Sequence, residues 1–356
     1  MMSKKYEKNT IIFLIGLFLL AIISLVSTTI GPVKISILQI IDILFESINI
    51  NTNLSSSEIS QAFKTVVIDI RLPRILMGII VGIALGISGA ILQGLFRNPL
   101  IDPGFIGVSS GAAIGAMFVI MFSQLIAIEN NFYIQFLLPV FAMSGGLSTT
   151  ILVYKMSQMS GKTNIMAMLL SGIAVNAFSG SIIGFLVYRA SDMELRSFTF
   201  WTLGSLDNSN WLIVSIAVVA ILIPIIISIN LRKKLDIFML GDAEAGYLGL
   251  NIEKLKKRII FISALMVGVT VAFCGMIGFI GLVTPHLVRL IMGPSHKTLI
   301  FGSAILGAII LILADFISRI IIAPAQLPIG IITSALGAPF FLWLIVSQKQ
   351  KIRYEK

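Results

Sequence analysis

The stretch LRKKLDIFMLGDAEAGYLGLNIEKLKKR, from Leu231 to Arg258, is the longest hydrophilic interruption in the second half of a very apolar chain. Basic residues open and close it. Lysine and arginine concentrate in the cytoplasmic loops of membrane proteins, so we expect the loop at 232–258 to face the cytoplasm. Asp242–Leu248 is expected to form a short helix, because Gly241 and Gly249 interrupt helices on either side. Such a helix between two membrane spans gives a cytoplasmic partner something to push on. The alternative is an ordinary connecting loop.

The composition places the chain in a membrane. Of its 356 residues, 57% are hydrophobic and 12% are charged, and the mean hydropathy is +1.02. Soluble domains carry about 25% charged residues, so we interpret the chain as a polytopic membrane protein. The net charge of +10 does not indicate a nucleic-acid partner, because the bases lie between apolar runs, where the positive-inside rule explains them. One cysteine, Cys274, excludes an intramolecular disulfide, and two histidines are too few for a histidine-built metal site.

Ten apolar runs predict an all-α protein of about ten transmembrane helices, with 1–356 as a single transmembrane domain. Most of the 26 lysines and arginines then fall on the cytoplasmic side together with both termini, so the charge bias supports this topology. The segment Gly31–Thr65 is expected to lie outside, with a short interfacial helix. The predicted spans are Ile11–Ile30, Val66–Phe96, Gly104–Phe122, Phe132–Tyr154, Thr163–Tyr188, Trp211–Leu231, Ile259–Phe279, a short Gly281–Met292, Leu299–Ile320 and Ile329–Val346.

Small residues repeat along the second and third spans, where they allow helices to approach closely in lipid. Close packing alone explains most of them. Prolines also interrupt the apolar runs, and broken helices are tolerated mainly where backbone lines a cavity or is buried in protein, which favours a transporter over a simple anchor. The small residues include Gly82, Gly86, Gly89, Gly111 and Gly115, and the prolines are Pro99, Pro103, Pro285, Pro328 and Pro339.

Motifs for ATP hydrolysis are not complete in this sequence. Ser160–Thr163 reads Ser-Gly-Lys-Thr, like the end of a P-loop, but Met156 stands where the first glycine should be and no strand precedes it. We interpret it as a cytoplasmic turn, and expect no ATP site, no enzymatic activity and no cofactor in this chain. An ion-coupled secondary transporter is the alternative from another class. Its carboxylates would lie within the membrane, whereas Asp69 and Asp315 lie near helix ends, where water or a neighbouring arginine satisfies them.

Several segments between about Arg71 and the end of the chain resemble the permease subunits of ABC importers for iron-siderophores, haem and cobalamin, the type II importers. The resemblance implies a homodimer of ten-helix subunits in the cytoplasmic (inner) membrane of a prokaryote. It also implies two cytoplasmic ATP-binding subunits, which use the ATP, and an extracytoplasmic substrate-binding protein. The segments are Arg71-Leu-Pro-Arg74, SGAILQGLFRNPLIDPGFIGVSSGAAIGA (88–116), LGDAEAGYLGL (240–250), GFIGLVTPHLVRL (278–290) and LPIGIITSALGAPFFLWL (327–344).

The resemblance assigns the opening stretch to the family's coupling helix, which lies in a cleft of the ATP-binding subunit. Closure of the nucleotide-bound dimer is then expected to push this helix and to rock the attached spans. The matching residues are Gly241, Asp242, Ala245 and Gly249.

Three arginines are expected on or near the external face, where the resemblance places basic residues against acidic residues of the binding protein. These are Arg71, Arg74 and Arg319. The alternative is that each side chain merely snorkels from a helix end towards the interface.

Two segments, Asp102–Gly111 and Glu194–Gly204, resemble the haem-permease form of this family. They favour haem as the substrate, with a ferric siderophore or cobalamin as the alternative.

A path for haem requires apolar walls and a cationic group near its entrance, because haem is a flat apolar ring with two propionates. Arginine pairs a carboxylate through two parallel hydrogen bonds and also lies against aromatic planes. We therefore expect Arg196, Phe200 and Trp201 to belong to the substrate pathway. The alternative is that Glu194 or Asp192 neutralises Arg196 at the helix end.

Overall fold

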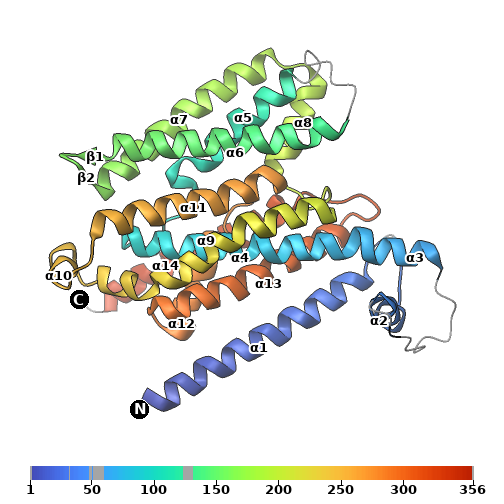
Figure 1. The fold of residues 1–356 in the computed structure, drawn as a ribbon, viewed down its shortest axis with the longest axis horizontal. Helices are drawn as coiled ribbons and strands as arrows, with labels where there is room; N and C mark the ends of the chain where they lie inside the picture. The colour runs from blue at the N-terminus through green and yellow to red at the C-terminus, as the bar shows by residue number, and fades with distance from the viewer. Residues whose placement is uncertain (1, 32, 48–49, 51–59, 123–130, 355–356) are drawn as a thin grey trace.

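The computed structural model describes residues 2–354 except 32, 48–49, 51–59 and 123–130. These residues form helices and one short antiparallel hairpin (Figure 1). The elements are α1 (Met2–Thr29), α2 (Ile37–Glu46), α3 (Gln61–Thr65), η1 (Val66–Arg71), α4 (Leu72–Phe96), η2 (Pro103–Ile106), α5 (Val108–Phe122), α6 (Asn131–Met156), β1 (Gln158–Met159), β2 (Lys162–Thr163), α7 (Ile165–Arg189), α8 (Asp192–Leu203), α9 (Trp211–Phe238), α10 (Asp242–Tyr247), α11 (Ile252–Cys274), α12 (Ile280–Met292), α13 (His296–Ile320) and α14 (Ile329–Tyr354).

The long helices run between two ends of the molecule (Figure 1). The hairpin, α10, the start of α1 and the end of α14 lie at one end, which we call the α10 end. At the opposite end, the α8 end, lie α2, α3 and α8.

The polytopic all-α fold is confirmed. In the described part of the chain, α1, α4, α6, α7, α9, α11 and α13 are each long and apolar enough to cross a membrane. The three remaining predicted spans correspond to shorter apolar helices, namely α5, α12 and the Ile329–Leu342 part of α14.

Two predicted boundaries are wrong at the central loop, because hydropathy marks where the membrane ends and not where a helix ends. Helix α9 continues past Leu231 to Phe238, and α11 begins at Ile252, where the Asn251 side chain accepts a hydrogen bond from the Lys254 N–H. All seven lysines and arginines at 232–258 therefore lie on helices.

The predicted span Ile259–Phe279 also ends too late. Helix α11 stops at Cys274, because Gly275 has φ +71°, and a Cβ there would collide with the Trp201 carbonyl. The Ser205 N–H donates to the Cys274 carbonyl at 2.8 Å, so the segment after α8 blocks any continuation of α11.

Helix α4 is the centre of the bundle and packs against α13, α11, α12 and α9. Its small residues face neighbouring backbone: a Cβ on Gly82 would collide with the Gly307 carbonyl, and one on Gly89 with the Gly281 carbonyl. The predicted close approach of helices is confirmed at these positions, and any larger side chain would force α12 or α13 away.

A second layer is made of α5, α6 and α7, and α11 joins it to the layer around α4 (Figure 1). Helices α5 and α6 approach closely, because Gly111 and Gly145 lie against each other's carbonyls and Gly115 lies against the Phe141 carbonyl.

The expected short helix in Gly31–Thr65 is α2. Ser36 and Gln39 form a capping box at its start, and Ile40 and Ile43 are buried on one face. Part of the segment, 51–59, lies outside the described residues.

Candidate functional site

The expected helix between Gly241 and Gly249 is present as α10. Gly241 has φ +131° and Gly249 has φ +77°, values that side chains with a Cβ rarely adopt, so the backbone favours glycine at both ends of the helix. Ala245 is fully buried, whereas Tyr247 and Leu248 are exposed. The helix thus presents an apolar surface to solvent at the end of the molecule.

Arg97 connects α10 to the ends of α4 and α9. Its guanidinium donates to Asp242 Oδ1 and to the Phe238 carbonyl, each at 2.6 Å, and lies 4.2 Å from the centre of the Phe238 ring. Burial raises the pKa of the Asp242 carboxyl, but hydrogen bonds from Arg97 and Lys256 outweigh this effect and hold the pKa below its ordinary value. Asp242 therefore stays a carboxylate at neutral pH and keeps both partners.

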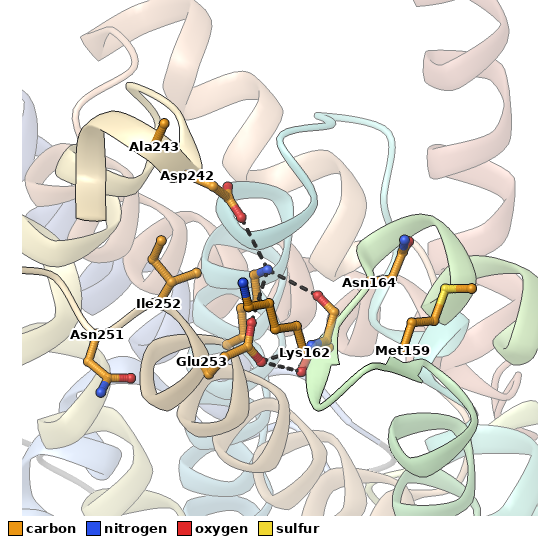
Figure 2. A pocket seen from close by; sticks show the side chains of 10 residues that line it. Met159, Lys162, Asn164, Asp242, Ala243, Asn251, Ile252 and Glu253 are labelled. Carbon is orange, nitrogen blue, oxygen red and sulfur yellow. Dashed lines mark hydrogen bonds and ion pairs between the residues drawn. The ribbon is translucent and has the colours of Figure 1, made fainter. Parts of the chain in front are cut away.

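Lys256 links α10 to the β1–β2 hairpin. It is 5% exposed, and its ammonium group donates to the Thr163 carbonyl at 3.0 Å and to Asp242 Oδ2 at 3.2 Å. Glu253 Oε2 accepts hydrogen bonds from the Thr163 N–H at 2.9 Å and from its hydroxyl at 2.7 Å. Figure 2 shows Asp242 and Glu253 approaching the hairpin from α10 and α11. These bonds join the hairpin, α10 and α11 around a groove of about 580 Å³.

The Ser-Gly-Lys-Thr motif is the turn of this hairpin. Ser160 and Gly161 have positive φ values and join the paired strands β1 and β2, a geometry that differs from the strand–loop–helix of a P-loop.

Sequence reasoning did not find Arg97, Lys256, Glu253 or Thr163 as members of this site. The three-residue spacing of Glu253 and Lys256 was a signal for a local pair. Their partner Thr163 is distant in sequence, so only the tertiary structure shows the link to the hairpin.

The three predicted docking arginines lie together at the α8 end and are mostly buried. Arg71, Arg74 and Arg319 are 5%, 8% and 8% exposed, and each contacts other parts of this chain. The Arg74 guanidinium contacts Asp315 Oδ1 at 2.8 Å and also pairs with Asp207. Arg319 pairs with Asp315 Oδ2 at 3.1 Å.

Backbone carbonyls also accept hydrogen bonds from two of these guanidinium groups. Arg319 donates to the Ile30 carbonyl at 2.8 Å, and Arg71 donates to the carbonyls of Thr28 and Val33. The arginines thus fasten the end of α1 to α4 and α13 at the α8 end. A direct contact with a binding protein stays a prediction.

Asp315 is the buried carboxylate that an ion-coupled carrier could have used. It is 2% exposed and forms ion pairs with both Arg74 and Arg319, so its burial is accounted for by a structural role within the bundle.

The structure brings two of the three predicted pathway residues to one surface of α8. Arg196 and Phe200 are exposed, and the guanidinium carbon lies 5.8 Å from the centre of the Phe200 ring. Trp201 is partly buried and stacks on Phe198 at 6.3 Å. Glu194 hydrogen-bonds the Ser191 N–H and so caps its own helix. Among the described residues, Arg196 has no ion pair, so the alternative of an internal pair with Glu194 or Asp192 is not what the structure has.

Helix α8 was not among the predicted elements, because the predicted spans stop at Tyr188 and resume at Trp211. The Ser191-x-x-Glu194 pattern is a capping box and could have predicted the helix.

Comparison with known proteins gives consistent relatives. The FecCD transport family matches residues 19–347. The chain is 40% identical over 340 residues to the hemin transport system permease protein HmuU of Yersinia pestis, which covers 94% of this chain and 95% of the relative. It is 36% identical over 287 residues to the cobalamin import system permease protein BtuC of Halobacterium salinarum, covering 81% of this chain and 75% of the relative. It is 31% identical over 346 residues to the iron(3+)-hydroxamate import system permease protein FhuG of Bacillus subtilis, covering 97% of this chain and 99% of the relative.

The fold has a solved counterpart. A structure described as a metal-chelate type ABC transporter in an inward-facing conformation superimposes with a TM-score of 0.81 at 30% identity, and covers 94% of this chain and 99% of that chain. With the family match over nearly the whole chain and relatives of these identities, the protein belongs to the FecCD transport family of ABC importer permeases.

Proposed function

We propose that this chain is the translocating subunit of an ATP-driven importer that carries haem across the cytoplasmic membrane. The observation that carries the choice of haem is the 40% identity to a hemin permease over 94% of the chain. The haem-like segments Asp102–Gly111 and Glu194–Gly204 support the same choice.

In this proposal α10 is the coupling helix and the α10 end faces the cytoplasm, with both chain termini. Two chains form a homodimer, and one ATP-binding subunit docks on each α10. The exposed Tyr247 and Leu248 support this role, since exposed apolar side chains on a short helix suit a protein partner. The Arg97–Asp242 pair supports it as well, because it fixes α10 to helices that cross the membrane.

Haem reaches the α8 end from an extracytoplasmic binding protein. Arg196 attracts a propionate there, and the Phe200 ring offers an apolar surface to the porphyrin. The exposure of Arg196 and its lack of an acidic partner among the described residues support this role, because the guanidinium needs no release before it meets a carboxylate.

A ferric siderophore or cobalamin is the second candidate. Permeases for cobalamin and for iron(3+)-hydroxamate are also among the relatives, at 36% and 31% identity. A ligand without carboxylates would make little use of Arg196, so substitution of this residue separates the candidates.

The test is uptake into proteoliposomes that contain this chain, its ATP-binding subunit and its binding protein. We expect ATP-dependent accumulation of haem that neither a ferric hydroxamate nor cobalamin inhibits when added in excess. ATP-dependent uptake of one of those competitors, without uptake of haem, would overturn the substrate proposal and leave the transport class intact. Haem uptake driven by an ion gradient without the ATP-binding subunit would overturn the coupling proposal.

A further inference from the structure

A pocket of about 560 Å³ lies between η2, α5 and α7, apart from the sites described above. Its volume falls in the range of about 300–1,000 Å³ that is typical of ligand pockets. The pocket combines apolar walls with a few polar atoms, as sites for small molecules do. Phe105, Ala113, Ile183 and Met276 provide apolar walls, and Asp102 and Ser109 provide polar groups.

The pocket lies within the depth of the membrane. Helix α12 has 13 residues and is therefore about 20 Å long, shorter than the hydrocarbon core of about 30 Å. It ends at Met292, shortly before His296, which bonds Asp236 at the α10 end, so the first turn of α12 lies inside the membrane. A Cβ on Gly281, in that turn, would lie 2.9 Å from the Pro103 ring, so η2 lies at the same depth. Two interrupted spans thus meet beside the pocket, and irregular backbone at this depth is tolerated where it is buried in protein or lines a cavity.

Asn176 on α7 holds one wall of the pocket together. Its side-chain oxygen accepts a hydrogen bond from the Ser110 hydroxyl at 2.7 Å, and its amide nitrogen donates to the Gly104 carbonyl at 3.3 Å. These bonds join α5, η2 and α7, so the shape of the pocket is set by the fold.

Asp102 is a carboxyl group at this depth with one oxygen open to a ligand. Its Oδ1 accepts a hydrogen bond from the Gly104 N–H at 2.7 Å, whereas no hydrogen bond or ion pair from the described residues reaches Oδ2. Ionisable groups inside a membrane are costly unless they are paired, and a lipid acyl chain offers no partner. The open oxygen therefore suits a ligand that carries positive charge.

The pocket adjoins the helix that receives haem in the proposed function. Ala113 and Met276, which line the pocket, pack in the same apolar cluster as Phe198 and Trp201 of α8. A ligand that leaves the surface of α8 therefore has this pocket next to it, deeper in the membrane.

We propose that this pocket is a haem site inside the membrane, in which the apolar walls hold part of the porphyrin ring and Asp102 Oδ2 is an axial ligand of the ferric iron. The inference rests on the proposed haem function. The centre of a ferric porphyrin carries a net positive charge, which matches the carboxylate, and oxygen ligands hold haem iron in proteins such as catalase. The carboxylate replaces a water molecule on the iron, and no electron is transferred. A single oxygen ligand also lets the haem leave again, as transport requires.

The first test changes the ligand and keeps the turn. In Asp102→Asn the amide oxygen still accepts the hydrogen bond from the Gly104 N–H, but the anionic ligand is gone. Haem is titrated into the full-length protein in detergent, and its absorption spectrum is recorded. We expect the parental protein to give the spectrum of an oxygen-ligated ferric haem, and Asp102→Asn to lose this spectrum and to bind about tenfold more weakly. The control is Asp69→Asn, which removes the same charge at an exposed position. Equal spectra and affinities in the two variants would overturn the role of Asp102.

The second test fills the pocket. Gly180 lines it, and a Cβ there meets no atom within 4 Å, so Gly180→Phe places a ring in the pocket without a collision at Cβ. Gly184→Phe is the control, because Gly184 lies one turn further along α7, is equally open and does not line the pocket. We expect Gly180→Phe to abolish the spectrum of bound haem and haem uptake into proteoliposomes, and Gly184→Phe to retain both.

The outcomes separate this inference from the proposed function. Absence of haem uptake by the parental protein would contradict the proposed function. Haem uptake by the parental protein and by both glycine variants at one rate would overturn only the pocket. Loss of the dimer in Gly180→Phe alone, measured by light scattering, would mean that a second copy of the chain fills the pocket, and would also overturn the haem site.

Discussion

At the residue scale, one arginine offers a direct test of the substrate proposal. Arg196 lies exposed over Phe200, so its guanidinium is available to a ligand carboxylate. We expect Arg196→Ala to reduce the rate of haem uptake by about tenfold, the factor for a loss of about 1.4 kcal/mol in one charge-assisted interaction. Lysine at this position restores part of the rate, because it keeps the charge but lacks the planar fork.

Measurement of haem uptake into proteoliposomes checks this prediction. Arg189→Ala, at the end of the preceding helix α7, serves as the control. Binding-protein docking and basal ATPase activity are expected to persist in Arg196→Ala. Uptake at the parental rate would remove Arg196 from the substrate pathway.

Two of the buried arginines at the α8 end are held by their contacts with Asp315. It is 2% exposed between Arg74 and Arg319, and removal of one partner from a buried ion pair costs about 3–5 kcal/mol. Asp315→Asn is therefore expected to lower the thermal unfolding midpoint clearly in detergent, whereas Asp69→Asn, at an exposed carboxylate, leaves it unchanged. Equal midpoints for the two variants would contradict a structural role for this network.

The same burial changes how docking must be tested. Charge reversal at Arg71 and Arg74 disturbs the packing of α1, α4 and α13, so weaker binding of the binding protein does not by itself indicate lost contact. Docking measurements on such variants need a parallel measurement of unfolding.

At the element scale, the link between the hairpin and α10 determines how a push on α10 spreads. Lys256 donates to the Thr163 carbonyl and to Asp242, so we expect the hairpin between α6 and α7 to move with α10. Lys256→Met is expected to lower the number of haem molecules transported per ATP hydrolysed. ATPase activity continues in this variant, but movement of α10 no longer reaches α6 and α7 through the hairpin. Lys257→Met is the matched control, since the Lys257 side chain is exposed.

Spin labels at Lys162 and Tyr247 provide a structural measurement for the same variants. We expect the distance distribution between the hairpin and α10 to broaden in Lys256→Met and to stay narrow in the control. A narrow distribution in both variants would show that other contacts hold the hairpin.

Gly249 tests the geometry of α10 itself. Its φ is +77°, but a Cβ there would meet no atom within 4 Å, so the cost of substitution comes from the backbone and not from a collision. Gly249→Val is expected to destabilise the backbone conformation at the end of α10 by about 1–2 kcal/mol. ATP-dependent transport is therefore expected to fall, while membrane insertion persists. Gly249→Asn retains most transport, because asparagine tolerates left-handed backbone. Equal transport by the two variants would mean that this conformation is not needed for coupling.

At the scale of the whole molecule, the ten-helix arrangement predicts which residues can be reached from each side of the membrane. Single cysteines at Lys257, at the α10 end, and at Met193, on exposed α8, are expected to react with a membrane-impermeant thiol reagent from the cytoplasmic and external sides respectively. Native Cys274 is 3% exposed and does not interfere. Labelling of both positions from the same side of intact cells would contradict the proposed topology.

The sequence by itself determined the class of fold and the positions of nearly all the long helices. Apolar runs, basic flanks and glycine positions are local signals, and lipid imposes them strictly, because each backbone polar group in a span must find a partner within its own helix. The same signals found α10 between Gly241 and Gly249, and the motifs from Arg71 onward identified the family.

Only the tertiary structure decided what the charged residues do. In the sequence, Arg71, Arg74 and Arg319 look like external bases. In the structure, Arg74 pairs with Asp207 and Asp315 from distant segments, and Arg71 donates to the carbonyls of Thr28 and Val33. In the sequence, Lys256 looks like one more basic residue beside a membrane span. In the structure, its ammonium group lies 3.0 Å from the Thr163 carbonyl oxygen. The sequence shows which residues carry a charge. The partner of each charge depends on how helices that are far apart in the chain pack side by side. The physical reason is that electrostatic and hydrogen-bond energies depend on distance in space and not on distance along the chain.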